Sequence, residues 1–226
     1  MDELINLNEV IKSHNEKVDL SMSDLLRSNM ETFELSSDIS PFSLSLRISK
    51  FEDEKAYIQF VKNCEKLSRQ SLEYNFWRKY IKDILGETVC HLTFENSVET
   101  DIHIHHHIPD IFTIIKAIVN KKLNNEQSFC TFDICTEAIE LHFKNGIGFV
   151  PLIESLHTKF HNGFLKIPIE IVSGNYSYFL ENYSQFLDEE DIAILDERLA
   201  VKQKDVEIKW SKDFYPGMMI QASGGI

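Results

Sequence analysis

Apolar residues recur at helical spacing through the first third of the chain. Between Glu52 and Leu85 they fall three or four positions apart, which predicts one long helix or two helices with a break. Gly86 suits the end of this helical stretch. Residues 1–40 are polar and acidic with an intermittent apolar pattern, for which we expect a short helix followed by a loop.

Alternation of apolar with other residues, or enrichment in β-forming residues, predicts short strands in five places. The expected strands are Leu44–Ile48, Val89–Phe94, Glu99–His105, Gly148–Leu152 and Phe164–Val172. A turn around Asn96 and Ser97 would pair the second and third of these as a hairpin. The sequence therefore predicts several antiparallel strands set among helices.

Helical patterns return in the second half of the chain, most of them with a recognisable end. The expected helices are Ile111 to an end at Asn124 and Asn125, Phe132–Phe143, Glu154–His161, Tyr178–Phe186 and Glu189 to about Gln203. Asn162 and Gly163 suit a left-handed C-cap, and Asp188 suits an N-cap for the last helix. Helices mixed with short antiparallel strands make the predicted fold class α+β.

Length and charge narrow the class of protein. A chain of 226 residues accommodates one main domain. Its 23 Lys and Arg residues stand against 36 Asp and Glu, a net charge of −13 with histidine neutral, which disfavours a broad electrostatic hold on DNA. Neither a signal peptide nor a membrane span is evident, so we expect no membrane partner and a location in the cytoplasm, the host cytoplasm if the protein is viral.

The first group of histidines lies on a predicted strand, in the segment from Asp101 to Pro109. Side chains alternate along a strand, so Ile102 and Ile104 anchor one face while Asp101, His103 and His105 project from the other. His106 is then expected to begin the exit from the strand.

The second group is His157 and His161, four residues apart on a predicted helix. This spacing places two imidazoles on one face, where they can hold one metal ion, and a third histidine from the strand would complete the set. Three neutral imidazoles with an open position are typical of a catalytic metal site. Either group alone fits a solvated surface better than a functional site.

Together the two groups resemble the HNH, or His-Me finger, nuclease family. The segment from His105 to Pro109 resembles its paired-histidine segment ending in proline, and residues 150–163 resemble its closing strand and helix. The resemblance implies His105, His157 and His161 as ligands of one divalent ion, Zn, Mg, Mn or Ni. It also implies His106 as the general base that activates water.

Some correspondences stay open. In another register His106 is the ligand and His107 the base. His103 falls where nuclease colicins of the family place an acidic residue, Asn145 is the nearest counterpart of the family's middle Asn, and Lys159 is a candidate phosphate contact. The spacer between the two matching pieces exceeds forty residues and has room for two inserted helices.

The chain divides by this interpretation into an N-terminal, mostly helical region (1–88), a His-rich ββα-metal-like core (89–175) and a C-terminal helical region with a tail (176–226), all in one compact unit. The first hypothesis is a metal-dependent phosphodiesterase acting on DNA. The alternative is a non-enzymatic viral or mobile-element interaction protein with a structural or degenerate His-metal site, whose acidic surface suits a basic protein partner.

Overall fold

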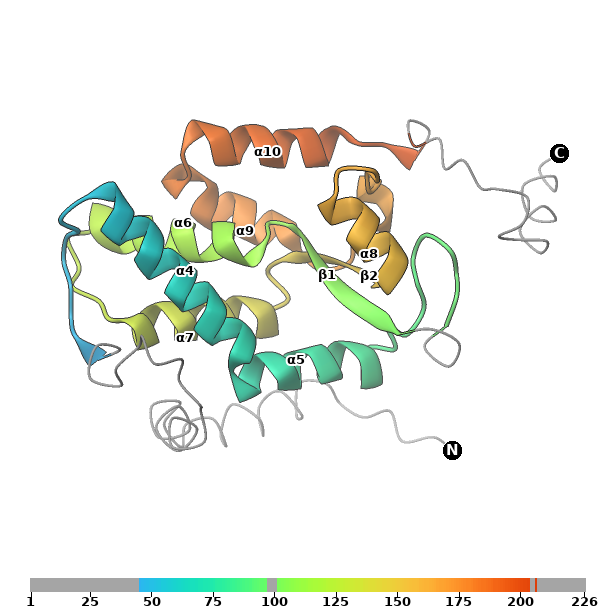
Figure 1. Ribbon diagram of the computed structural model, residues 1–226, viewed down its shortest axis with the longest axis horizontal. Coiled ribbons are helices and arrows are strands. Elements are labelled where there is room, and N and C mark those ends of the chain that lie inside the picture. The colour runs from blue at the N-terminus through green and yellow to red at the C-terminus, as the bar shows by residue number, and fades with distance from the viewer. Residues whose placement is uncertain (1–44, 97–100, 204–205, 207–226) are drawn as a thin grey trace, which may run out of the picture.

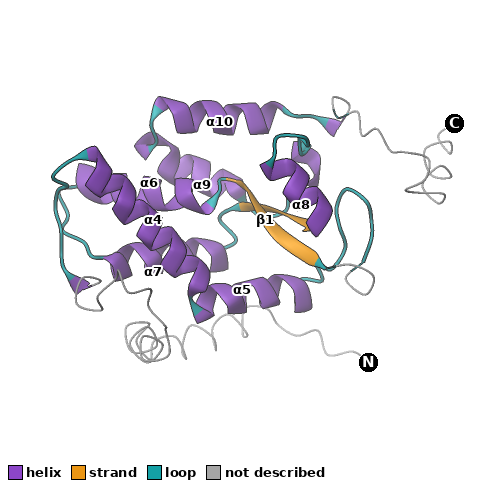
Figure 2. Cartoon of the chain, in the orientation of Figure 1, coloured by secondary structure: helices purple, strands orange, loops and turns teal. Residues whose placement is uncertain are grey.

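The computed structural model describes residues 45–96, 101–203 and 206 (Figure 1). Within them, seven α helices surround a two-stranded antiparallel sheet, which confirms the predicted α+β class (Figure 2). The helices are α4 (Glu54–Gln70), α5 (Leu72–Asp83), α6 (Ile111–Asn124), α7 (Thr131–Phe143), α8 (Glu154–His161), α9 (Tyr176–Tyr183) and α10 (Glu189–Ala200). The strands are β1 (Ile102–Ile108) and β2 (Gly148–Ile153).

Short polar side chains set where several helices begin. The long helical stretch breaks at Ser71, which ends α4 and caps α5 by accepting a hydrogen bond from the amide of Tyr74. Asp110 caps α6, and Asp188 caps α10 as predicted. Each such cap stabilises its helix by about 1 kcal/mol, because it satisfies an amide that has no partner within the helix.

The sheet brings together two segments that lie far apart in the sequence. β1 and β2 run antiparallel, with His105 opposite Val150 and His103 opposite Leu152. Helices α6 and α7 are inserted between the two strands, and α8 follows β2 directly (Figure 1). The order strand, inserted helices, strand, helix is therefore a ββα arrangement with a long helical insertion.

Two groups of buried side chains hold these elements together. The larger core lies among α4, α5, α6 and α7 and includes Trp77, Ile118 and Phe179. The smaller core joins β2 to α8 and to the loop before β1, through Leu152, Leu156 and other side chains. Because the larger core draws residues from all three predicted regions, the described residues pack as one unit.

Three predicted strands differ from the structure. Of Leu44–Ile48, Leu44 lies outside the described residues and Ile48 forms only an isolated bridge to Phe129. The hairpin prediction is wrong, because β1 pairs with β2, and Val89 forms a single bridge to Asn96. The segment Phe164–Val172 forms no ladder and contains the 3-10 turn Ile169–Ile171. Alternation of apolar and polar residues alone does not show which other segment a strand pairs with.

A pair of fully buried histidines lies between β1 and α7. The Nε2 atoms of His106 and His142 are 2.9 Å apart, and Nδ1 of His142 lies 2.6 Å from the carbonyl oxygen of Ala138. The carbonyl oxygen only accepts, so His142 carries its proton on Nδ1 and His106 donates from Nε2. Burial lowers the pKa of His142 to about 4 and that of His106 well below its usual range.

We expect these two imidazoles to make stability fall in mild acid. Above pH 6.5 they are neutral in both states, whereas between pH 6.5 and about 4 the unfolded chain takes up protons that the folded protein refuses. The free energy of unfolding should fall by up to about 1.4 kcal/mol per pH unit for each imidazole. Urea unfolding from pH 7.5 to 5 measures this slope.

The variant His106→Leu/His142→Leu tests the source of that slope. It removes both partners of the hydrogen bond together, so neither is left buried and alone. Its pH dependence should be shallower than that of the wild type. An unchanged slope would show that other groups control the acid sensitivity.

Candidate metal centre

The strand β1 presents three histidines on one face, beneath helix α8. Alternation places His103, His105 and His107 on this face, and Ile102, Ile104 and His106 on the other. Helix α8 packs against both β1 and β2. Histidines of the strand and of the helix therefore meet at the junction.

His105, His157 and His161 bring one ring nitrogen each to within 4.8 Å of one another. The Nε2 atoms of His157 and His161 are 3.2 Å apart, and the ring centre of His105 lies 5.2 Å from each of theirs. The Nε2 atom of His105 is buried and has no hydrogen-bond partner among the described residues. A histidine with an orphaned buried nitrogen, beside two further imidazoles, fits a site that is completed by a cation.

The sequence of α8 explains how its two histidines are held. The helix has the predicted bounds and brings His157 and His161 to one face. Leu156 anchors it in the smaller core, and the ring of Phe160 packs on His105 with centres 4.4 Å apart. Gly163 follows with a φ of 74°, the left-handed conformation predicted for the end of the helix.

Burial keeps three imidazoles of this junction, those of His105, His107 and His157, neutral near pH 7. It lowers the pKa of His105 to about 2 and that of His107 to about 3, assisted by neighbouring positive groups. It lowers the pKa of His157 to about 4, with His161 and His103 adding to the effect. A neutral imidazole keeps the lone pair that a metal ion needs, so near pH 7 protons do not compete at these positions.

His103 lies at the exposed side of the cluster. Its ring stacks on His157 with centres 5.3 Å apart and planes at 16°. Its Nε2 atom is 3.5 Å from one carboxylate oxygen of Asp101. The other carboxylate oxygen of Asp101 lies 3.8 Å from Nζ of Lys82. His103 therefore joins the cluster from the side on which a ligand or water would approach.

His107 lies deeper on the same face and is held through its backbone. Its carbonyl oxygen accepts a hydrogen bond of 2.7 Å from Arg198, which also lies 3.3 Å from Asp110 and over the ring of Phe160. Its ring runs close to the backbone of Ile167 without a hydrogen bond of normal geometry at either nitrogen. Arg198 thus fixes the end of β1 and the aromatic ring that covers His105.

Other predicted residues lie away from the cluster. His106 does not leave the strand; β1 continues through it because it pairs with Phe149, so its ring turns toward Trp77 and His142. This corrects the expectation that His106 lies beside the ligands. Asn145 sits in the turn after α7, where its carbonyl accepts the amide of Asn175. Lys159 is on α8 and exposed.

Three contributors were not found from the sequence. His142 stands alone among apolar residues, and its partner His106 was expected outside the core. Phe160 and Arg198 carry no motif, because their role arises from packing against β1 across the fold. For Phe160, the one signal in the sequence is its position directly before the candidate ligand His161.

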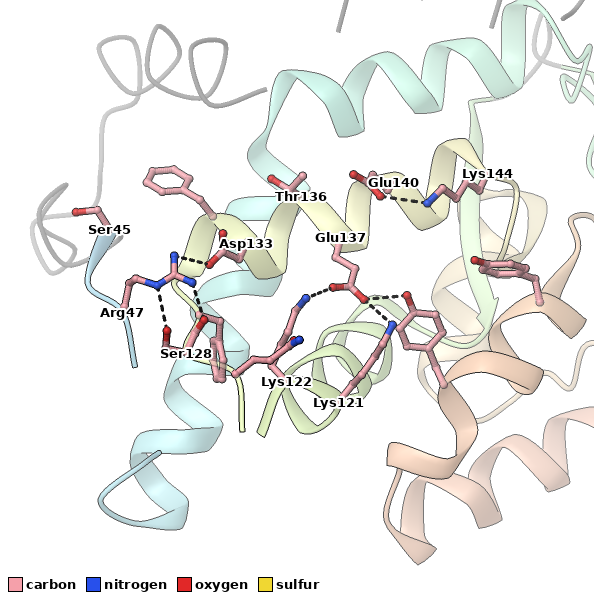
Figure 3. A pocket seen from close by; sticks show the side chains of 15 residues that line it. Ser45, Arg47, Lys121, Lys122, Ser128, Asp133, Thr136, Glu137, Glu140 and Lys144 are labelled. Atoms are coloured by element: carbon pink, nitrogen blue, oxygen red, sulfur yellow. Dashed lines mark hydrogen bonds and ion pairs between the residues drawn. The ribbon is translucent and has the colours of Figure 1, made fainter. Parts of the chain in front are cut away.

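An open pocket of about 1090 Å³ lies beside α6, α7 and α9, apart from the histidine cluster (Figure 3). Its wall is rich in charged side chains that pair with one another. The pairs are Arg47 with Asp133, Lys121 and Lys122 with Glu137, and Lys144 with Glu140. Mutual neutralisation gives this pocket no strong preference for a charged ligand, so the histidine cluster is the stronger candidate site.

Fold and site together define an α+β protein with a three-histidine cluster at a ββα junction. A family model described as Bacteriophage G278-like virion protein matches residues 7–220, and the chain belongs to this family. No curated protein and no solved structure gives a significant match. Among the described residues, no helix is long and apolar enough to cross a membrane.

Removing Arg198 should loosen the cluster without touching a ligand. Arg198→Met removes a charge-assisted hydrogen bond to a buried strand carbonyl, for which we expect a loss of about 2 kcal/mol in the free energy of unfolding. Urea denaturation measures it. Lys166→Met is the matched control, because the pair of Lys166 with Glu197 is exposed and contributes little. Equal effects of the two substitutions would refute this role of Arg198.

Proposed function

We propose that the protein is a virion component in which His105, His157 and His161 bind one zinc ion that fastens helix α8 to strand β1. The observation that carries this proposal is the convergence of three imidazoles, one of which, His105, has a buried ring nitrogen without a hydrogen bond. A protein of a virion family is expected to work through contacts with other proteins, so we propose a protein partner.

The set of ligand atoms favours zinc over the other divalent ions that the family resemblance implied. Three imidazoles and no carboxylate suit zinc or nickel, whereas magnesium and manganese prefer oxygen ligands. Zinc accepts a tetrahedral site with three histidines and a fourth ligand. The fourth ligand would be water or the nearby His103, whose ring stacks on His157.

A metal ion at this site would link helix α8 to strand β1. Helix α8 has eight residues and buries only Leu156, which is a small anchor for an element that closes one end of the molecule. Isolated helices of this length are not stable in water, so tertiary contacts must hold it. An ion shared between the strand and the helix would supply a strong and directional contact.

A metal-dependent HNH-type phosphodiesterase is the second candidate. The order of strands and helix, with a histidine on β1 and two on α8, favours it. A divalent ion held there would polarise a phosphate oxygen. His106, the base that the resemblance implied, is bonded to His142 on the other face, so His103 or His107 would have to take that role. The charge of −13 weighs against DNA as the substrate.

Metal content tests the proposal directly. Protein purified without a histidine tag should keep about one zinc ion per chain through gel filtration, measured by plasma mass spectrometry. His157→Ala and His161→Ala should each retain less than about a tenth of it, because two imidazoles hold zinc poorly. At a zinc concentration 100 times Kd, the free energy of unfolding of the wild type should rise by about 2.7 kcal/mol.

Lys159→Ala is the matched control, since it changes an exposed residue of the same helix between the two ligands. It should retain zinc and its stabilising effect. Loss of zinc from Lys159→Ala, or full retention in both histidine variants, would contradict the proposed ligand set.

The nuclease candidate is decided on the same samples. Metal-loaded protein is incubated with supercoiled plasmid in zinc, nickel, magnesium or manganese. Nicking that His103→Ala abolishes while zinc content stays at one per chain would establish the second candidate with His103 as its base. Zinc binding without nicking in any of the four ions would exclude the nuclease candidate and leave the structural zinc site as the remaining function.

A further inference from the structure

The outer face of helix α5 carries an exposed apolar stripe. Its inner face packs into the core through Tyr74, Trp77 and Ile81. On the outer side, Leu72 is 56% exposed and Ile84 at the helix end is 62% exposed. They lie twelve residues apart, and Phe76 between them is half exposed and stacks on Phe143 of α7. The stripe therefore follows the length of α5, which is the lowest of the described helices in the view of Figure 1.

The same pair of helices is basic in an acidic protein. Residues 54–83, which span α4 and α5, contain seven Lys and Arg residues against four Asp and Glu. Lys79 is exposed on α5 beside the apolar stripe, and Lys62 is exposed on α4. An apolar stripe with basic neighbours suits an acidic, amphipathic segment, because burial and charge then act together.

The chain itself contains such a segment before the described residues. Residues 1–44 contain nine Asp and Glu residues against three Lys and Arg, and within them residues 18–33 contain three against one. Between Val18 and Phe33, apolar residues recur at helical spacing, whereas the acidic residues fall mainly between them. Six of the seven apolar residues share this spacing, Val18, Met22, Leu25, Leu26, Met30 and Phe33, and Leu20 does not. The spacing matches what a helix needs to cover a single apolar stripe.

The segment is long enough to reach α5. Ser45, the first described residue, lines the same pocket as Phe132 near the start of α7. Phe143 at the far end of α7 contacts Phe76, so the path along α7 is about 20 Å. The eleven residues from Glu34 to Leu44 span up to about 36 Å when extended. Residues 18–33 can thus lie along α5 of their own chain.

We propose that residues 18–33 dock as an amphipathic helix on the outer face of α5 in the same chain. The docked segment would cover Leu72, Phe76 and Ile84 and set its carboxylates beside the lysines of α4 and α5. It would thereby neutralise the basic surface of these helices. This proposal is independent of the metal site.

Limited trypsin digestion of the full-length protein tests the docking. Lys17 and Arg27 lie at the edge of the segment and inside it, and docking protects them. The variant Leu72→Glu/Ile84→Glu changes two exposed side chains, so the fold is retained while apolar contact is lost and the acidic segment is repelled. Cleavage at Arg27 should accelerate at least about tenfold, since proteolysis follows the population of the open form. Mass spectrometry follows the released N-terminal peptide.

Two further variants make the result decisive. Leu26→Glu, within the segment itself, should accelerate cleavage similarly without altering α5. Ile194→Glu, at an exposed position of α10, is the matched control and should leave the rate unchanged. Wild-type rates in both test variants would overturn the proposal. Protection that disappears on dilution would also overturn it, because the segment would then dock on a second copy.

Discussion

Strand β1 imposes the main constraint on this fold, because it buries imidazoles on both of its faces. His105, His106 and His107 are all less than a tenth exposed, and a buried polar group without a partner costs free energy. On one face His106 is satisfied by His142. On the other face, His105 keeps a buried ring nitrogen without a hydrogen bond, and one of its ring nitrogens lies within 4.8 Å of those of His157 and His161. The strand therefore separates a hydrogen-bonded histidine pair from a cluster suited to a metal.

The packing around β1 differs between its two faces. The larger core covers the face of His106 with Trp77 and Tyr74. The smaller core sets α8 over the other face, and Arg198 of α10 binds the backbone where the strand ends. Since low pKa values keep His105 and His157 neutral, these two remain in the form that the core tolerates and that a cation binds. The same property serves the fold and the proposed site.

Local patterns predicted much of the fold and part of the site. Helical periodicity and caps located most of the helices, and the spacing of His157 and His161 predicted that they share a face with a strand histidine. The pairing of β1 was not predictable, because its partner β2 lies beyond two inserted helices. The position of His106 depends on that pairing. Because the strand continues past His105 through His106, the side chain of His106 points into the core. Arg198 and His142 act through contacts across the fold, which periodicity does not encode.

Membership of a virion protein family and a strongly acidic chain fit a metal site that organises a protein surface better than one that cleaves DNA. The most direct test of the zinc site is the X-ray absorption spectrum of the zinc-loaded full-length protein at the zinc edge. The account predicts three imidazole nitrogens at about 2.0–2.1 Å, with one further nitrogen or oxygen. Sulfur neighbours at about 2.3 Å, or a shell of water oxygens without imidazole scattering, would contradict it.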